Sequence, residues 1–336
     1  MLQQASQGAT SVDRFIVIFP SIVFEALPFI VLGALISGTL EVLLPQKFLT
    51  RVMPKRRWLA IALACTLGLI FPMCECGIVL VMRRLLSKGL PLGCAIAYML
   101  SAPIINPIVI ASTWAAFSGA DRIDGITNVQ MLSLRLGGAF LIAYTVGLIV
   151  NRLAESRGTA NLIQPIRGLA HRPQEDDDEE GNATVAKKRS TLQILTAISE
   201  VTLHDFVDIT CYLVIGALLA SLVQAFQLVK YAPGVTNNAI LMILFMMGLA
   251  IILCLCSEAD AFVAANLPLP PELALGGKVA FLVLGPMLDL KLYFMYTQTL
   301  KKRLIWSIMG SVTVMVFLYA VAVHYLNAAA LAAVTK

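Results

Sequence analysis

The sequence predicts an all-α polytopic membrane protein with two inverted repeats, each made of about three spans and one re-entrant or broken-helix hairpin. Composition is the first reason: 59% of the 336 residues are hydrophobic and 13% are charged, whereas soluble domains are nearer half apolar and a quarter charged. The second reason is that apolar segments long enough to cross a bilayer recur along the chain. The third is that the two halves of the sequence resemble each other.

About eight apolar windows define the expected hydrophobic segments. They cover residues 15–44, 58–82, 91–118, 131–150, 206–229, 239–257, 275–298 and 304–326. The formal net charge of +5 is spread over the intervening loops, which is typical of a basic rim beside a membrane rather than of a nucleic-acid-binding surface. We therefore expect membrane lipid as a partner and no nucleic acid.

The longest polar stretch, residues 152–199, divides the chain into an N-terminal transmembrane repeat (1–151) and a C-terminal one (200–336). It holds an unbroken run of acids over residues 175–180, followed by Lys187, Lys188 and Arg189. Such a composition cannot bury enough apolar surface to fold. We expect a disordered cytoplasmic linker, and a regulatory or partner-binding segment is the alternative.

The two halves align without a gap around one motif. A shift of 183 residues places LGCAIAYMLSAPIINP (92–107) on LGGKVAFLVLGPMLDL (275–290), and a shift of 180 places Cys74-Glu75-Cys76 on Cys254-Leu255-Cys256. The same features recur in the same order. This pattern indicates an internal duplication.

The basic residues predict how the two halves are oriented, because short cytoplasmic loops collect Lys and Arg. If both Cys-x-Cys segments are re-entrant, the basic residues of 47–57, 83–88, the linker and 301–303 share one side, and Arg14, Arg122, Lys230, Lys278 and Lys336 remain on the other. Each half then crosses the membrane three times, an odd number. The halves are therefore expected to be inverted, with both termini outside, as in many transporters.

The first candidate site is the segment Cys74-Glu75-Cys76. Pro72 and Gly77 flank it, and both residue types disfavour a continuous helix. Irregular backbone at membrane depth is tolerated only inside protein or beside water. We expect this segment at the tip of a hairpin, where the two thiols could converge on a soft solute and Glu75 would lie near water.

The second tip carries the matching cysteines and two acids, Glu258 and Asp260. Ionisable side chains at membrane depth are functional candidates by default. Glu75, Glu258 and Asp260 are candidates for proton coupling, because a carboxyl group removed from water binds a proton more readily.

Two further breaks lie in the aligned motif. Pro103 and Pro107 flank Asn106 in the first half, and the matching segment of the second half contains Pro286, Asp289 and Lys291. Prolines leave carbonyl groups unpaired, and Asn106 could complete a solute site there. Asp289 and Lys291 are close enough in sequence to neutralise each other, although two residues apart is poor helical geometry for an ion pair.

Packing is the alternative for the cysteines, because an isolated membrane cysteine usually acts as a small hydrophobic residue. We assign that role to Cys65, Cys94 and Cys211. The sequence has no His/Cys spacing of a structural zinc site, so we expect no metal site and no cofactor.

At these residues the chain resembles the predicted-permease family that includes the organoarsenical efflux permease ArsP. The resemblance rests on PMCECG (72–77), KGLPLG (88–93), APIINP (102–107), CSEADAF (256–262) and FLVLGPMLDLK (281–291). It implies a permease of the bacterial cytoplasmic membrane and, for the arsenical branch, export of thiol-reactive organoarsenicals with cysteines on the arsenic. One departure is Glu75, where family members tend to have a small residue; the extra charge leaves room for a cationic or proton-coupled substrate.

The sequence therefore predicts a secondary transporter rather than an enzyme, with a small-molecule or metalloid solute as its partner and room for a homo-oligomer. No nucleotide-binding P-loop motif is present. Two alternatives stay open: a membrane thiol oxidoreductase that uses the Cys-x-Cys pairs, and a passive channel.

Overall fold

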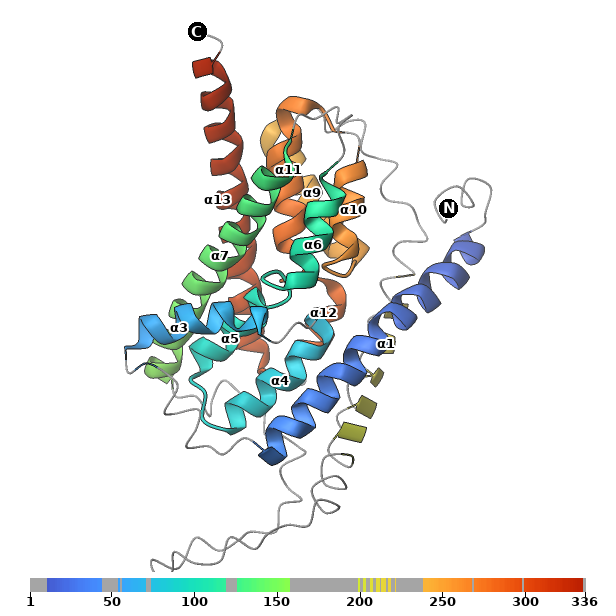
Figure 1. Ribbon diagram of the computed structural model, residues 1–336, viewed down its shortest axis with the longest axis vertical. Coiled ribbons are helices and arrows are strands. Elements are labelled where there is room, and N and C mark those ends of the chain that lie inside the picture. Colours follow the sequence, from blue (N-terminus) through green and yellow to red (C-terminus); the bar gives the residue numbers. More distant parts are fainter. Residues whose placement is uncertain are drawn as a thin grey trace, which may run out of the picture.

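The computed structural model describes residues 11–43, 54, 56–70, 74–118, 126–157 and 238–334, except 268 and 298, together with scattered residues between 199 and 221. Most of the predicted linker, 152–199, lies outside the described residues. The described elements are helices (Figure 1). They are α1 (Ser11–Leu43), α3 (Arg57–Thr66), the 3-10 turn η1 (Leu67–Leu69), α4 (Glu75–Ser87), α5 (Leu92–Ser101), α6 (Pro107–Ala116), α7 (Asn128–Arg157), α9 (Ala239–Leu253), α10 (Ala259–Asn266), α11 (Pro271–Leu284), α12 (Leu290–Tyr296) and α13 (Lys302–Val334).

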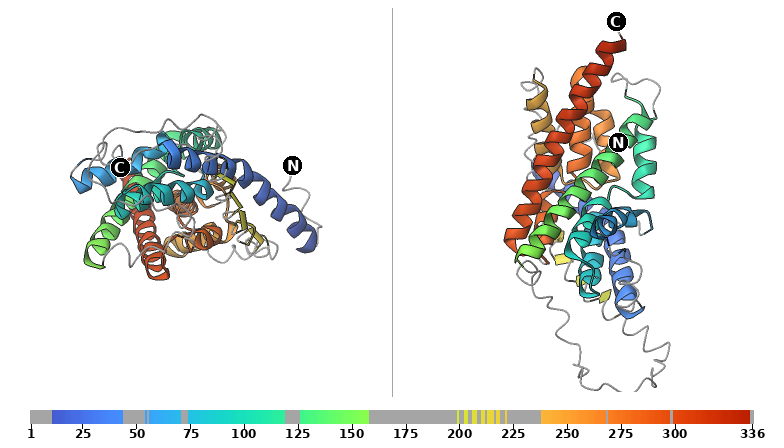
Figure 2. Two further views of the ribbon diagram at one scale, coloured as in Figure 1. Left: turned by 90° about the horizontal axis from the view of Figure 1, so that it is seen from below. Right: turned by 90° about the vertical axis from the view of Figure 1, so that its left-hand side faces the viewer.

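Two helices are long and apolar enough to cross a membrane by length and composition, over Asn128–Ser156 in α7 and Lys302–Ala328 in α13. They cross each other and run in opposite directions (Figures 1 and 2), and the Tyr319 hydroxyl of α13 donates to the Leu134 carbonyl of α7 over 2.8 Å. Several shorter helices, including α5, α6 and α9, are also apolar. The prediction of a helical membrane protein is therefore supported by the architecture.

Two of the predicted windows are broken helices, and the breaks fall at matching positions. The segment between α5 and α6 turns at residues 102–105, and that between α11 and α12 turns at residues 285–288. Asn106 caps α6 by accepting from the Ile108 amide over 2.9 Å, and Asp289 caps α12 by accepting from the Leu292 amide over 2.5 Å. Side-chain oxygens are good partners for the free amides of a helix start. The 183-residue shift thus joins equivalent structural positions.

The short helices occupy two levels of the molecule. In Figure 1, α3 and α4 lie in the lower half of the view, and α9 and α10 lie in the upper half. The broken helices connect the levels, because α6 packs against α10 and α12 packs against α4. A short helix of each half, α4 or α10, therefore packs against the second segment of the broken helix of the other half, α12 or α6.

Glycines permit the closest crossings between helices. A Cβ atom on Gly93 of α5 would lie 2.6 Å from the Gly147 carbonyl oxygen and 2.6 Å from the Asn151 Cβ of α7. The same approach recurs between α11 and α13, where a Cβ on Gly276 would lie 3.0 Å from the His324 Cβ. Small residues at such crossings let two backbones approach in membrane proteins.

We expect Gly93→Ala to destabilise the protein by about 1–3 kcal/mol, because the added methyl group must displace backbone at the crossing of α5 and α7. The measurement is the thermal midpoint of the detergent-solubilised protein. Gly310→Ala in α13 is the matched control: nothing lies within 4 Å of the added Cβ, and alanine in a helix interior is favoured over glycine by roughly 0.5–1 kcal/mol. Equal midpoints for the two variants would contradict the close crossing.

Candidate functional site

The first Cys-x-Cys segment stands at the start of α4. Cys74 is the N-cap residue, with φ −73° and ψ 170°, and Glu75 is the first residue of the helix. An acid at this position is favoured by the helix dipole. The start of α4 packs closely on α1, where a Cβ on Gly33 would lie 2.8 Å from the Gly77 Cα. Gly33 therefore lets α1 approach the backbone of α4 at Gly77. The Cys76 side chain lies outside the described residues.

Glu75 forms an ion pair with a residue of the other repeat. Its Oε1 accepts from the Lys291 ammonium over 3.0 Å. Lys291 Nζ also lies 3.7 Å from Asp289 Oδ2, and this oxygen is buried without a hydrogen-bond partner among the described residues. Lys291 thus stands between two carboxylates, and its closer partner is Glu75 rather than Asp289.

A second buried ion pair joins α7 to α10. Arg135 Nη2 donates to both carboxylate oxygens of Asp260, over 2.9 and 3.0 Å, and to the Ser257 carbonyl over 2.8 Å. Its Nη1 donates to the Thr113 hydroxyl of α6 over 2.7 Å. The guanidinium therefore holds α6, α7 and the start of α10 together.

Ser257 connects the two ion pairs, because its hydroxyl donates to Glu75 Oε2 over 3.4 Å. We call the resulting set the ionic network. Its charged members are 0–3% exposed, and ions removed from water at this depth are costly unless they are paired and hydrogen-bonded. The network consists of Thr113, Arg135, Ser257, Asp260, Glu75, Lys291 and Asp289.

The network carries three carboxylates and two cations. Glu75, Asp260 and Asp289 are the acids, and Arg135 and Lys291 are the bases. If all five groups are charged, one negative charge is left over. A single bound proton or monovalent cation would make the network neutral.

The second Cys-x-Cys segment lies beside this network. Cys254 ends α9 with a left-handed backbone, φ 46°, and its buried thiol donates to the Ile251 carbonyl over 3.2 Å. The same sulfur interacts with the backbone amides of Leu290 and Lys291 at the start of α12. The half-buried Cys256 accepts from the Ala259 amide over 3.4 Å. Among the described residues, no three His, Cys, Asp or Glu side chains are grouped to hold a metal ion.

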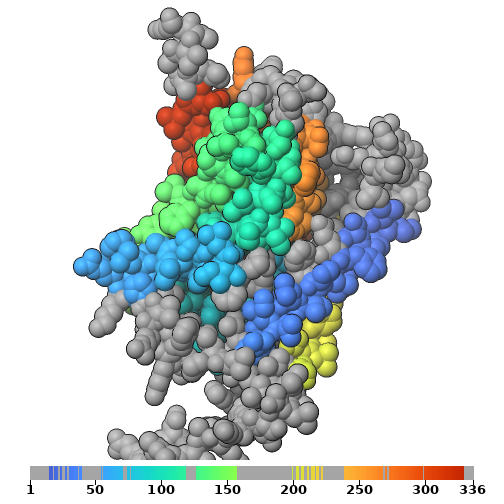
Figure 3. Space-filling view, in the orientation of Figure 1, coloured from blue at the N-terminus to red at the C-terminus, as the bar shows by residue number. Residues whose placement is uncertain are grey.

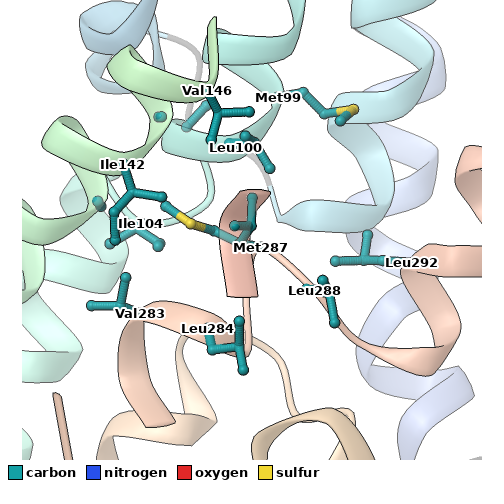
Figure 4. Packing of buried hydrophobic residues seen from close by; sticks show 14 of the residues in the cluster. Met99, Leu100, Ile104, Ile142, Val146, Val283, Leu284, Met287, Leu288 and Leu292 are labelled. Carbon is teal, nitrogen blue, oxygen red and sulfur yellow. The ribbon is translucent and has the colours of Figure 1, made fainter. Parts of the chain in front are cut away.

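The other predicted residues shape the breaks. Pro103 and Pro286 are buried in the two turns, Pro107 is the exposed first residue of α6, and Asn106 is buried as its cap. Glu258 is half-buried, directly before α10. Apolar side chains pack the two breaks together, with Met287 near the centre of Figure 4 and Ile104 to its left. The two breaks therefore share one apolar core.

The structure differs from the sequence-based expectations at three charged residues. Glu75 is 1% exposed and paired, not beside water, because the start of α4 is enclosed by α1, α12 and the Ser257 turn. Lys278, expected on the outer side, is fully buried in α11 and donates to the Ala265 carbonyl over 3.3 Å. Arg135 was not predicted as a site residue, although a lone arginine inside the 131–150 window was a usable signal.

The chain is similar to known protein sequences over most of its length. A family model described as "Predicted permease" matches residues 11–325. The "UPF0718 protein YcgR" of Bacillus subtilis strain 168 is 34% identical over 299 residues, which cover 89% of this chain and 93% of the relative. A Streptococcus mutans serotype c protein is 32% identical over 310 residues, covering 92% and 95%; it carries the provisional name of a two-component membrane permease complex subunit. No solved structure matches the chain significantly.

Proposed function

Because the chain belongs to the predicted-permease family and is a membrane permease, we propose that it is a proton-coupled secondary transporter of the bacterial cytoplasmic membrane. The observation that carries this proposal is the ionic network. It lies where the broken helices of both halves meet the starts of α4 and α10. In transporters, interrupted helices near the midplane of the bilayer bind the solute and the coupling ions. Charged side chains within the membrane are typical of the pathway along which the solute and the ions move.

The proposed architecture is a pair of inverted repeats in a multi-pass protein. Three features support it: the equivalent breaks at Asn106 and Asp289, the glycine crossings of α5 with α7 and of α11 with α13, and the two levels of short helices in Figure 1. Both ends of the chain would then lie outside, with the linker in the cytoplasm. A reporter fused after Lys336 should give an outside signal.

The proposed substrate is a small, thiol-reactive metalloid compound such as a trivalent organoarsenical, moved outward. Cys74 and Cys254 support this substrate because they flank the Glu75–Lys291 ion pair, and thiolates are preferred ligands of soft centres. The protein would then act as a transporter and not as an enzyme.

The name of the Streptococcus mutans relative describes a subunit of a two-component complex. By extension, we propose that this chain works with a second membrane subunit, or with another copy of itself. Figure 3 shows α1 and α3 on opposite flanks of one face of the molecule, and exposed apolar side chains line both, including Phe24, Val31, Trp58 and Leu63. Lipid or a partner helix could cover either flank.

The proposal is tested with everted membrane vesicles that contain the chain. We expect vesicles to accumulate a trivalent organoarsenical when a proton gradient is imposed, and accumulation to stop when the gradient is collapsed. Vesicles with Lys291→Met protein, matched for the amount of protein, are the control, because the variant lacks the central cation. Flux that does not saturate or respond to the gradient would indicate a channel, and a thiol–disulfide cycle during turnover would indicate an oxidoreductase.

A further inference from the structure

Lys291 lies between carboxylates that belong to different elements. Asp289 is the cap of α12, the helix that carries Lys291, whereas Glu75 belongs to α4 in the other half of the chain. The ammonium donates to Glu75 over 3.0 Å and lies 3.7 Å from Asp289 Oδ2, beyond hydrogen-bond distance. The Lys291–Glu75 ion pair therefore joins α4 to α12. An ion pair of Lys291 with Asp289 would lie within α12 and its cap, and would not hold α12 to another helix.

A lysine is well suited to move between two such partners. Its ammonium is a compact charge on a flexible four-carbon stem, in contrast to the planar fork of arginine. The Arg135–Asp260 pair differs in this respect, because Arg135 donates hydrogen bonds to Thr113, Ser257 and Asp260 at once. We therefore expect Lys291 to be the mobile cation of the network and Arg135 the fixed one.

We propose that Glu75, Asp289 and Lys291 form the binding site for one coupling proton, and that the proton decides whether α4 and α12 are joined. This inference rests on the proposed transport function. When a proton binds a Glu75 carboxylate oxygen, an O–H bond forms and the hydrogen bond from Lys291 to that oxygen breaks. The ammonium keeps its own protons and pairs with Asp289 Oδ2. The network changes from one net negative charge to neutral, and release of the same proton restores the ion pair with Glu75.

The surroundings of Glu75 agree with this assignment. Lys291 contacts Glu75 from α12, which also carries Asp289 as its cap. Ser257 donates to Glu75 from the turn before α10, and Asp260 in α10 forms an ion pair with Arg135. Glu258 precedes α10, and the Cys254 thiol lies against the start of α12. Helices α5 and α1 also pack against α4. Helix α5 has no charged residue, and the charged side chains of α1 lie outside the described residues. Lys291 is thus the cation in direct contact with Glu75 among the described residues.

Cys74 provides a readout that needs no substrate. It directly precedes Glu75 and is 3% exposed, so that separation of α4 from α12 should expose its thiol. The experiment uses the full chain with its six other cysteines replaced by serine. Labelling by N-ethylmaleimide is measured at several pH values, and each rate is divided by the rate for the same protein unfolded in detergent, which removes the intrinsic pH dependence of the thiol.

We expect the normalised rate to rise as the pH falls, since protonation of Glu75 releases Lys291. Glu75→Gln should label on the order of tenfold faster at neutral pH, and independently of pH, because a buried ion pair has lost its partner. Asp289→Asn makes the same change in charge and is the matched control. Asparagine retains the helix cap, as Asn106 does in the other half, and Lys291 is left with Glu75 alone. This variant should therefore label more slowly than the parent at every pH.

The proposal is overturned if the two variants change the rate in the same direction, or if the parent rate does not depend on pH. A normalised rate of one shows that a variant has unfolded. In that case the pH dependence of the labelling rate of the parent protein still tests the proposal. Replacing sodium with choline should change nothing; a sodium-dependent rate would make the site a metal-cation site instead. Since labelling requires no solute, a pH-dependent rate without organoarsenical transport would contradict the proposed substrate and leave the proton site in place.

Discussion

Replacing Arg135 with methionine is expected to prevent the chain from accumulating as folded protein. The guanidinium is fully buried, and the substitution removes its hydrogen bonds to Asp260, Ser257 and Thr113 together. Breaking a buried ion pair by removing one partner typically costs about 3–5 kcal/mol, because the other charge is left uncompensated. That is a large part of the stability of an ordinary domain, about 5–15 kcal/mol. The measurement is the yield of monodisperse protein on size-exclusion chromatography in mild detergent.

Two comparisons separate the loss of charge from the loss of volume. Arg152→Met makes the same substitution on the exposed side of the same helix, α7, and should leave the yield unchanged. The double variant Arg135→Met/Asp260→Asn removes both charges and should recover part of the yield, since replacing both members of a buried pair is far less harmful than replacing one. If the single variant at Arg135 gave the same yield as Arg152→Met, the Arg135–Asp260 pair could not be what joins α7 to α10.

The breaks in the helices could be predicted from the sequence because their causes are local. Pro103 and Pro107 lack an amide hydrogen and restrict the residue before them, and the repeat transferred the prediction to Pro286 and Asp289. In the structure Asn106 and Asp289 cap the helices that follow the breaks, whereas the sequence-based prediction gave them a solute site and an ion pair with Lys291. The prediction of a break at Pro103 and Pro107 used residues within a few positions of each other, and only its transfer to the second half used the alignment of the two halves.

The partners of the charged residues could not be predicted in this way, because they depend on tertiary contacts. Lys291 is two residues from Asp289 and 216 residues from Glu75 in sequence, yet Glu75 is its closer partner. Arg135 and Asp260 are 125 residues apart. Without the arrangement of α4, α7, α10 and α12, the sequence indicates only that buried charges need partners. It does not indicate which ones.

Lys278 shows a related difficulty. The basic-residue rule applies to loops, yet the prediction counts Lys278 on the outer side although this residue lies three residues inside the predicted 275–298 window. In the structure α11 begins at Pro271, so Lys278 lies within the helix and reaches the Ala265 carbonyl near the end of α10. Without Lys278 the outer side keeps only Arg14, Arg122, Lys230 and Lys336, so the expected excess of basic residues on the other side remains.

Replacing Cys74 or Cys254 with serine is expected to abolish transport of soft, thiol-reactive solutes while leaving the protein folded. Both cysteines are buried beside the Glu75–Lys291 ion pair, Cys74 as the N-cap of α4 and Cys254 against the start of α12. Serine is close to cysteine in size, and at position 254 its hydroxyl can keep the hydrogen bond to the Ile251 carbonyl, so we expect the fold to be retained. A hydroxyl oxygen, however, is a poor ligand for a soft centre. Losing about 1.4 kcal/mol of binding free energy already weakens affinity tenfold.

Selectivity distinguishes solute contact from packing. Cys65 and Cys94 are also buried, but they belong to α3 and α5 and not to either Cys-x-Cys segment, so Cys65→Ser and Cys94→Ser are the matched controls. Everted vesicles should show that Cys74→Ser and Cys254→Ser lose uptake of a trivalent organoarsenical by on the order of tenfold or more, whereas the two controls transport it normally at equal protein levels. A packing role predicts instead that all four variants differ only in thermal stability. If Cys74→Ser and Cys254→Ser transported the organoarsenical as well as the parent, the thiols would only shape the helix ends, and the solute would have to be recognised by the charges of the ionic network.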